Sequence, residues 1–280
     1  MKTPEVLLDG LRFPEGPRWH EDRLWFSDMH AGRVMAVGMD GIAETIVEVE
    51  AEPSGLGWLP DGRLLVVSMQ DRRLLRLDPK GLTEVADLSG LASFHCNDMV
   101  VDSRGHAYVG NFGFDLHAGD DPIGANLILV RPDGEAEVAA ADLLFPNGMV
   151  ITPDGRTLIV GESFGARLTA FDLAQDGRLS RRRVWAQLEG FVPDGICLDA
   201  EGAIWVASPV GQGGVARVRE GGEVIDRIAV EHEAFACMLG GPDRRTLFIC
   251  TSPDSDPAKT GDRRGRIEVV AVDVPGAGLP

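Results

Sequence analysis

The sequence contains six copies of one pattern, and this internal repetition constrains the fold more than any other feature. Each copy has a short apolar run, a polar turn and a second apolar run that ends in small or polar residues. The copies begin at residues 15, 54, 97, 147, 194 and 236, a spacing of about 40–50 residues. Further apolar runs follow, such as "GRVMAVG" and "AETIVEV" after the first copy. Each unit is therefore expected to contain about four short strands.

Units of this length with four strands each are typical of the blades of a β-propeller. The turns "PDGR" at 60–63 and 153–156 are hairpin signals. A sandwich or a barrel also uses short strands, but neither would explain six equivalent starting points. We therefore predict an all-β chain that forms one domain over 1–280, a six-bladed β-propeller of four-stranded blades. The N-terminal "EVLLDG" should pair beside "GRIEVVAVDV", which closes the last blade and covers an exposed edge.

Charge and composition narrow the class of partner. The net charge is −17 at neutral pH, which disfavours binding to nucleic acids and to anionic membranes. No apolar run is long enough to span a bilayer, and no signal peptide is evident at the N-terminus. We therefore expect a cytoplasmic monomer or weak homo-oligomer that acts on a small molecule. The cysteines show no metal-binding spacing and are expected to be buried, reduced thiols: Cys96, Cys197, Cys237 and Cys250.

Aligning the six copies on their first residue defines a ring of side chains. The innermost strand of every propeller blade lines the central channel, so equivalent positions in these strands surround the axis. The six positions are Glu15, Ser54, Asn97, Asn147, Asp194 and Ala236. Carboxylate and carboxamide oxygens suit hard divalent cations. We predict that Glu15, Asn147 and Asp194 bind one divalent metal ion, with Ca²⁺ favoured and Zn²⁺, Mn²⁺ or Fe²⁺ possible.

The alternative interpretation is that these Glu-Gly, Asn-Gly and Asp-Gly pairs are ordinary turn dipeptides. The fourth copy argues against it, because "PNG" at 146–148 and "PDG" at 153–155 occupy different registers there. Only the second of these lies at the hairpin position.

Further residues are expected near the same end of the channel. The second strand of each blade returns toward the ring, which places Asn111 there, and Trp58 and Met99 could line a pocket. For the methionine, packing between blades is the alternative. His95 could be an acid/base group or a polar residue of the rim. The Gly- and Asp-rich segment 111–126 departs from the calcium-loop pattern and is predicted to be a loop that covers the substrate.

Four motifs resemble the gluconolactonase/regucalcin (senescence marker protein) family: "FPEGPRW", "FHCNDMVVDSRG", "FPNGMVITPDG" and "VPDGICLDAEGAIWVA". They occur in the family's order over nearly the whole chain. The resemblance implies a six-bladed propeller with a divalent metal near one end of the channel and, for many members, lactone hydrolysis. It assigns Glu15, Asn147 and Asp194 to the metal, Asp194 also as a base, and Asn97 with Asp98 to substrate and metal-bound water. His95 stands where members that act on sugar lactones often carry arginine, which favours a less polar substrate than an aldonolactone.

The favoured function is a metal-dependent hydrolase that opens a lactone ring to a hydroxy acid. The cation would polarise the carbonyl group, and Asp194 or Asp98 would accept the proton of the attacking water. A serine hydrolase is disfavoured because the chain has no GxSxG motif. Two alternatives stay open: a strictosidine-synthase-like propeller with other chemistry, and a non-enzymatic calcium-binding propeller.

Overall fold

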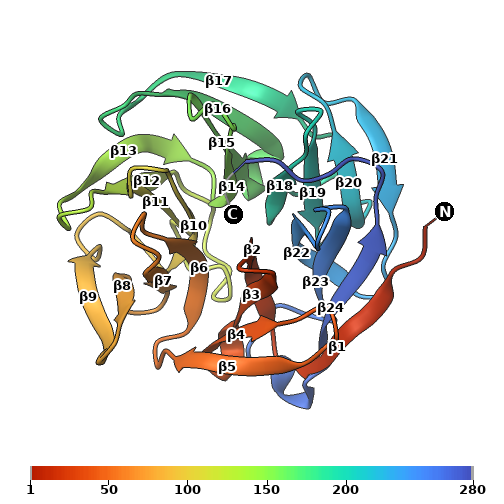
Figure 1. The fold of residues 1–280 in the computed structure, drawn as a ribbon. Helices are drawn as coiled ribbons and strands as arrows, with labels where there is room; N and C mark the ends of the chain where they lie inside the picture. The colour runs from red at the N-terminus through yellow and green to blue at the C-terminus, as the bar shows by residue number, and fades with distance from the viewer. Residues whose placement is uncertain (1, 279–280) are drawn as a thin grey trace.

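The computed structural model describes residues 2–278. Within this range, six four-stranded antiparallel sheets are arranged around one axis (Figure 1). The predicted six-bladed β-propeller is therefore confirmed, and each of the six blades corresponds to one copy of the sequence repeat. The other regular elements of this range are three short 3₁₀ turns: η1 (Met29–Ala31), η2 (Ser163–Gly165) and η3 (Thr260–Asp262).

The strands follow one another outward from the axis in each blade. Blades one to three consist of β2 (Pro14–His20), β3 (Arg23–Asp28), β4 (Arg33–Val37), β5 (Ala43–Glu48); β6 (Pro53–Trp58), β7 (Leu64–Ser68), β8 (Arg73–Asp78), β9 (Gly81–Asp87); and β10 (Cys96–Val101), β11 (Ala107–Asn111), β12 (Ala125–Val130), β13 (Ala136–Leu143). Blades four to six consist of β14 (Pro146–Ile151), β15 (Thr157–Glu162), β16 (Arg167–Leu173), β17 (Leu179–Gln187); β18 (Ile196–Leu198), β19 (Ile204–Ser208), β20 (Gly214–Val218), β21 (Val224–Ile228); and β22 (Glu233–Gly240), β23 (Thr246–Ser252), β24 (Gly265–Ala271), β1 (Glu5–Leu11).

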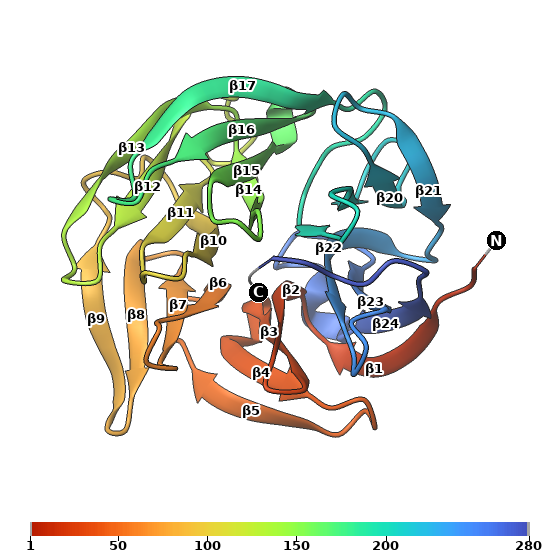
Figure 2. The ribbon, with the colours of Figure 1, turned by 45° about the horizontal axis from the view of Figure 1, so that its top comes forward.

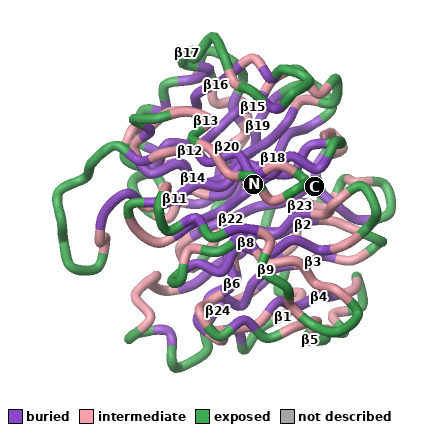
Figure 3. Tube along the Cα trace, turned by 90° about the vertical axis from the view of Figure 1, so that its left-hand side faces the viewer, coloured by how far each residue is buried: buried purple, intermediate pink, exposed green. Residues whose placement is uncertain are grey.

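Burial decreases from the axis outward, which explains the sequence pattern of each strand. The inner strands β10 and β14 are buried at every residue, because a propeller packs both faces of each blade against its neighbours. The outermost strand β17 exposes most of its residues. Figure 3 shows the same gradient, with buried strands inside and exposed loops at the surface. The apolar runs found in the sequence are thus the strands that bury both faces.

The ring of blades is closed by the two ends of the chain. β1 pairs antiparallel with β24, with Glu5 opposite Val269 and Leu11 opposite Gly265. This confirms the predicted closure, and β1 covers the outer edge of β24. The segment after β24, drawn in dark blue in Figure 2, runs inward toward the middle of the ring. There it bonds to blade five, since the Ala277 N–H donates to the Leu198 carbonyl at 2.9 Å.

Two further expectations concern the whole chain. All four cysteines are buried and unpaired, as predicted. Among residues 2–278, no helix has the length and apolar character needed to cross a bilayer.

Candidate active site at one end of the channel

A register shift lies at or beside the ring position in most of the inner strands. The pairing between first and second strands shifts just after this position in blade one, across it in blades two, three and four, and just before it in blade six: Glu15 to Arg18, Pro53 to Leu56, Cys96 to Met99, Pro146 to Met149 and Ala234 to Ala236. A bulge locally turns the strand and redirects its side chains. The repeated bulge explains how strands that are otherwise buried present polar side chains to the channel at one level.

The glycines that follow the ring residues have a packing role. A Cβ atom on Gly148 would lie 2.5 Å from the Asp194 carbonyl oxygen of the next blade, and one on Gly195 would lie 2.5 Å from the Ala236 Cβ. Neither glycine has a positive φ. The Gly148 N–H donates to the Asp194 carbonyl at 3.1 Å. Asn147 and Gly148 lie within β14, while Asp194 and Gly195 lead directly into β18. Both dipeptides pack against the neighbouring blade, so neither is a hairpin turn.

The two carboxamides of the ring are oriented by hydrogen bonds from their NH₂ groups. Asn147 Nδ2 donates to Asp194 Oδ1 at 2.5 Å and to Ser163 Oγ at 3.3 Å. Asn97 Nδ2 lies 3.5 Å from the Pro146 carbonyl oxygen. Because the nitrogen atoms face protein acceptors, the Oδ1 atoms are left for another partner. Both side chains are buried, so these oxygens are held in place.

Three carboxylates interact electrostatically at this level. Burial raises the pKa of Glu15 to about 8, and the nearby Asp98 charge adds to the shift, while the Gly16 N–H opposes it. Burial also raises the pKa of Asp194 well above its usual range, reinforced by the charge of Glu15. The pKa of Asp98 is raised by burial and opposed by the positive charge of Arg18. Like charges are therefore gathered here at an electrostatic cost.

Arg18 is a functional-site residue that the sequence analysis missed. Arg18 is 5% exposed, and its guanidinium group donates to Asp98 Oδ1 at 2.7 Å and to the Met99 carbonyl at 2.5 Å. The pair thus links the inner strands of blades one and three. A signal was available in the repeats, because the equivalent position in the other five copies holds Gly57, Val100, Val150, Cys197 and Leu239. A lone charge at a buried position requires a partner.

The charge balance at the ring matches a divalent cation. Arg18 neutralises Asp98, so Glu15 and Asp194 supply two negative charges when both are ionised. Among residues 2–278, no three His, Cys, Asp or Glu side chains lie close enough to form a metal site by themselves. Carboxamide oxygens such as Asn147 Oδ1 would therefore have to complete the ligand set, and they are typical partners of hard cations.

Three predicted substrate contacts lie elsewhere or are already engaged. Trp58 is at the end of β6 remote from Ser54 and stacks on His20 at 4.0 Å. Met99 is fully buried in the core between blades two and three, so packing accounts for it. Asn111 reaches the correct end of the channel, but its amide donates to the Asn126 carbonyl at 2.6 Å and accepts from the Gly113 N–H. We therefore remove these three residues from the site.

His95 stays near the ring. It is half-buried, stacks on Phe94 at 4.1 Å and meets Phe112 edge-on at 6.1 Å. Burial lowers its pKa, which favours the neutral imidazole. The following segment, 112–124, is a loop between β11 and β12. Its Phe114 packs against Phe145 at 5.9 Å, so the loop leans toward blade four.

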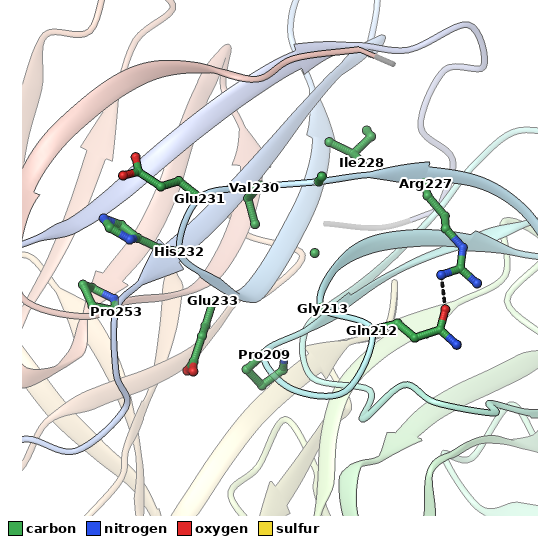
Figure 4. Close-up of a pocket in the computed structure, with 12 residues that line it drawn as sticks. Pro209, Gln212, Gly213, Arg227, Ile228, Val230, Glu231, His232, Glu233 and Pro253 are labelled. Carbon is green, nitrogen blue, oxygen red and sulfur yellow. Dashed lines mark hydrogen bonds between the residues drawn. The ribbon is translucent and has the colours of Figure 1, made fainter.

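A separate hollow opens on the same face, farther from the axis, between blades five and six (Figure 4). Its volume is about 560 Å³, and its lining includes Pro209, Arg227, His232 and Glu233. Arg227 donates to the Gln212 side chain within it. None of the six ring residues lines this hollow, so the hollow and the ring are distinct features.

Comparison with known proteins supports the resemblance of nearly the whole chain to the gluconolactonase/regucalcin family. The family model "SMP-30/Gluconolactonase/LRE-like region" matches residues 13–253. A 6-deoxy-6-sulfogluconolactonase of Pseudomonas putida is 28% identical, over 95% of this chain and 93% of that protein. A pentonolactonase of Haloferax volcanii is 25% identical, over 100% and 97%. The structure of a gluconolactonase from Xanthomonas campestris superposes with a TM-score of 0.78 at 26% identity, over 96% and 89%. This chain therefore belongs to the SMP-30/gluconolactonase/LRE-like family.

Proposed function

We propose that this protein hydrolyses a lactone to a hydroxy acid with the help of one divalent cation held at the ring. The observation that carries the proposal is the convergence of Glu15, Asp194 and the Oδ1 atom of Asn147 at one end of the channel. The relatives named as lactonases support the reaction class. The small-molecule substrate follows from the same comparison.

The donor set of the ring fits a hard cation. Glu15 and Asp194 supply carboxylate oxygens, and Asn147 supplies an amide oxygen whose own NH₂ group is engaged. Ca²⁺ is favoured by this chemistry, while Zn²⁺, Mn²⁺ and Fe²⁺ also accept such ligands. When bound, the cation supplies a Lewis acid for the lactone carbonyl.

Asp194 is the proposed proton acceptor. Its Oδ1 atom is fixed by the 2.5 Å hydrogen bond from Asn147, which leaves Oδ2 to take a proton from the attacking water. Asp98 has the weaker claim, because Arg18 and the Met99 N–H both donate to its Oδ1 and stabilise its ionised form. Asn97, buried beside it, would orient the substrate through its carbonyl oxygen or its second N–H. General base catalysis of this kind contributes about 10²–10⁴-fold to the rate.

The test is hydrolysis of a panel of lactones by the purified protein, with EDTA and with single cations added back. Activity should disappear with EDTA and return with one or more cations. Glu15→Ala and Asp194→Ala should abolish both cation binding, measured by calorimetry, and turnover, while the far-UV spectrum stays that of a β protein. Glu50→Ala, which removes an exposed carboxylate on the same face, is the matched control and should change neither.

Two results would contradict the proposal. Full activity in chelated, metal-free protein would exclude the cation. Tight cation binding without turnover of any lactone would favour the alternative of a calcium-binding propeller without enzymatic activity. Asp98→Asn separates the two candidate bases, because it should lower turnover less than Asp194→Asn does.

A further inference from the structure

An apolar collar surrounds the polar ring at its open end. We define the collar as the side chains of Phe13, Met29, Met69, Phe112, Phe145 and Phe235. Five of them form one contact cluster that runs through blades six, one, two and three. Phe13 and Phe235 meet at 4.7 Å, and Phe112 stacks on Phe145 at 4.4 Å, which extends the collar to blade four. Five collar residues immediately precede an inner strand or follow a second strand, and Phe235 lies within β22 directly before the ring position Ala236, so the collar lies at the level just outside the ring.

Most polar side chains at the same level are already engaged within their own blades. The second strands of the six blades end in Asp28, Ser68, Asn111, Glu162, Ser208 and Ser252. In blades one, four and five this side chain accepts a hydrogen bond from the backbone that leads into the inner strand. The donors are the N–H groups of Phe13 at 3.0 Å, Leu144 at 2.8 Å and Val192 at 2.9 Å.

Asn111 and Ser252 have equivalent roles. Asn111 holds the loop that follows β11, as described above, and Ser252 Oγ donates to the Asp254 carbonyl at 2.8 Å. These five side chains therefore hold loops in place and are not available to bind a ligand.

The cationic groups nearest the ring are engaged as well. Arg18 is bound to Asp98. Arg12 donates to the His30 carbonyl and to the Pro257 carbonyl. His30 itself bonds to Thr260 Oγ1 at 2.9 Å. The polar side chains near the collar that keep free atoms include His95, Arg12, whose Nε has no partner, and Glu52, whose Oε2 has no partner.

We infer that the lactone accepted by this site carries an apolar substituent, alkyl or aryl, which packs against the collar, instead of several hydroxyl groups. The inference rests on the proposed function and names its substrate class. A sugar lactone would bring several hydroxyl groups against phenylalanine and methionine side chains with few donors and acceptors to meet them. A buried hydroxyl without a partner lowers binding by roughly 5- to 150-fold. An apolar group of matching size instead gains affinity as its surface leaves water.

The test compares three lactones with the same six-membered ring, of which the decanolactone and the gluconolactone both release a secondary alcohol. δ-Decanolactone carries a pentyl chain, δ-valerolactone is unsubstituted, and D-glucono-1,5-lactone carries hydroxyl groups. Each kcat/KM is divided by the rate of spontaneous hydrolysis under the same conditions, with the cation that supports activity. We expect the order decanolactone, valerolactone, gluconolactone, with at least a tenfold difference between the first and the last.

Variants connect the preference to the collar. Phe112→Ala should lower kcat/KM for decanolactone at least tenfold, mostly through KM, and leave the value for valerolactone within threefold. Phe112→Leu, which keeps an apolar side chain, should recover most of the loss and shows whether the alanine variant is merely misfolded. Arg227→Ala, in the separate hollow of Figure 4, is the control and should leave the order unchanged.

The outcomes distinguish failure of the apolar preference from failure of lactone hydrolysis itself. Turnover of gluconolactone at an equal or higher normalised rate would overturn the apolar preference and leave lactone hydrolysis intact. A Phe112→Ala variant that is folded and keeps full selectivity would also overturn it. No turnover of any of the three lactones, with every cation tried, would overturn the proposed function and the inference together.

Discussion

Replacing Gly148 by alanine tests the central geometric claim, that the glycine of "PNG" holds neighbouring inner strands together. The added Cβ would lie 2.5 Å from the Asp194 carbonyl oxygen, 2.5 Å from the Ile196 nitrogen and 2.8 Å from the Gly195 Cα. All three are backbone atoms of blade five, so no side chain can rotate away. The strands must separate, which also stretches the 3.1 Å hydrogen bond from Gly148 to Asp194.

The size of the effect follows from these contacts. Overpacking a rigid site costs about 1–3 kcal/mol, and weakening a buried hydrogen bond adds about 1 kcal/mol. The free energy of unfolding should therefore fall by roughly 2–4 kcal/mol, which lowers Tm by about 4–10 °C in a domain of this size. Because Asp194 moves with its backbone, cation affinity should fall with it, by about tenfold or more.

The assays are thermal unfolding followed by circular dichroism and cation binding followed by calorimetry. Gly90→Ala is the matched control: Gly90 is exposed, has no positive φ, and a Cβ there would meet nothing within 4 Å. It should change stability by no more than about 1 kcal/mol. If Gly148→Ala lowers Tm no more than Gly90→Ala does and leaves cation affinity unchanged, the packing role of the glycine is refuted.

Three further predictions follow from buried groups. Arg18→Met leaves Asp98 charged, 5% exposed and without its partner, so the free energy of unfolding should fall by about 3–5 kcal/mol in denaturant titrations. Adding Asp98→Asn should recover part of this loss. If the effects of the two substitutions are purely additive, the two residues do not stabilise the fold as a pair. Burial lowers the pKa of His30 to about 4, so between about pH 6.5 and 4 this histidine is protonated in the unfolded chain and neutral in the folded chain. Stability should therefore be complete above about pH 6.5 and fall by about 3 kcal/mol as the pH drops to 4, and His30→Phe should flatten that slope; an unchanged slope would contradict the assignment. The four cysteines are buried, so a thiol reagent should react slowly with native protein and titrate four thiols after unfolding, whereas rapid native labelling would show that the blades open.

The repeat made the fold predictable, because six equivalent starting points define six blades and their inner strands. The oxygen-rich ring followed from the same alignment, and the structure places Glu15, Asn147 and Asp194 at one end of the channel. The assignment of Trp58 failed because it lies four residues beyond Ser54 along an extended strand, about 13 Å away. The assignment of Met99 failed because the bulge after Cys96 turns this side chain into the core.

Other parts of the site depend on contacts that no local pattern encodes. The Arg18–Asp98 pair joins blades one and three across the channel, and 80 residues separate its members. Asn111, at the end of β11, was predicted to contact the substrate, but its side chain forms hydrogen bonds to the backbone of Gly113 and Asn126. The collar is likewise assembled from blades that are distant in sequence. Such pairings become visible only when the ring is closed.

A last prediction is that Glu15 lowers the stability of the cation-free protein and raises the stability of the cation-bound protein. Without a cation, its half-buried carboxyl group lies near those of Asp98 and Asp194, and its ionised form is disfavoured because its pKa is raised to about 8. Glu15→Gln keeps the shape and removes the ionisable group, so the cation-free variant should be more stable than the cation-free wild type, by roughly 1–3 kcal/mol.

Saturating cation should reverse the order of stability. A ligand present at a hundred times its Kd stabilises the wild type by about 2.7 kcal/mol, while Glu15→Gln, which lacks a ligand charge, should gain little. Thermal unfolding of both proteins with EDTA and with added Ca²⁺ measures the four values that are needed. A crossing of the two stabilities identifies Glu15 as a residue kept for binding at the expense of folding. If Glu15→Gln is less stable than the wild type under both conditions, Glu15 is a structural residue, and the proposal that the ring binds a cation is contradicted.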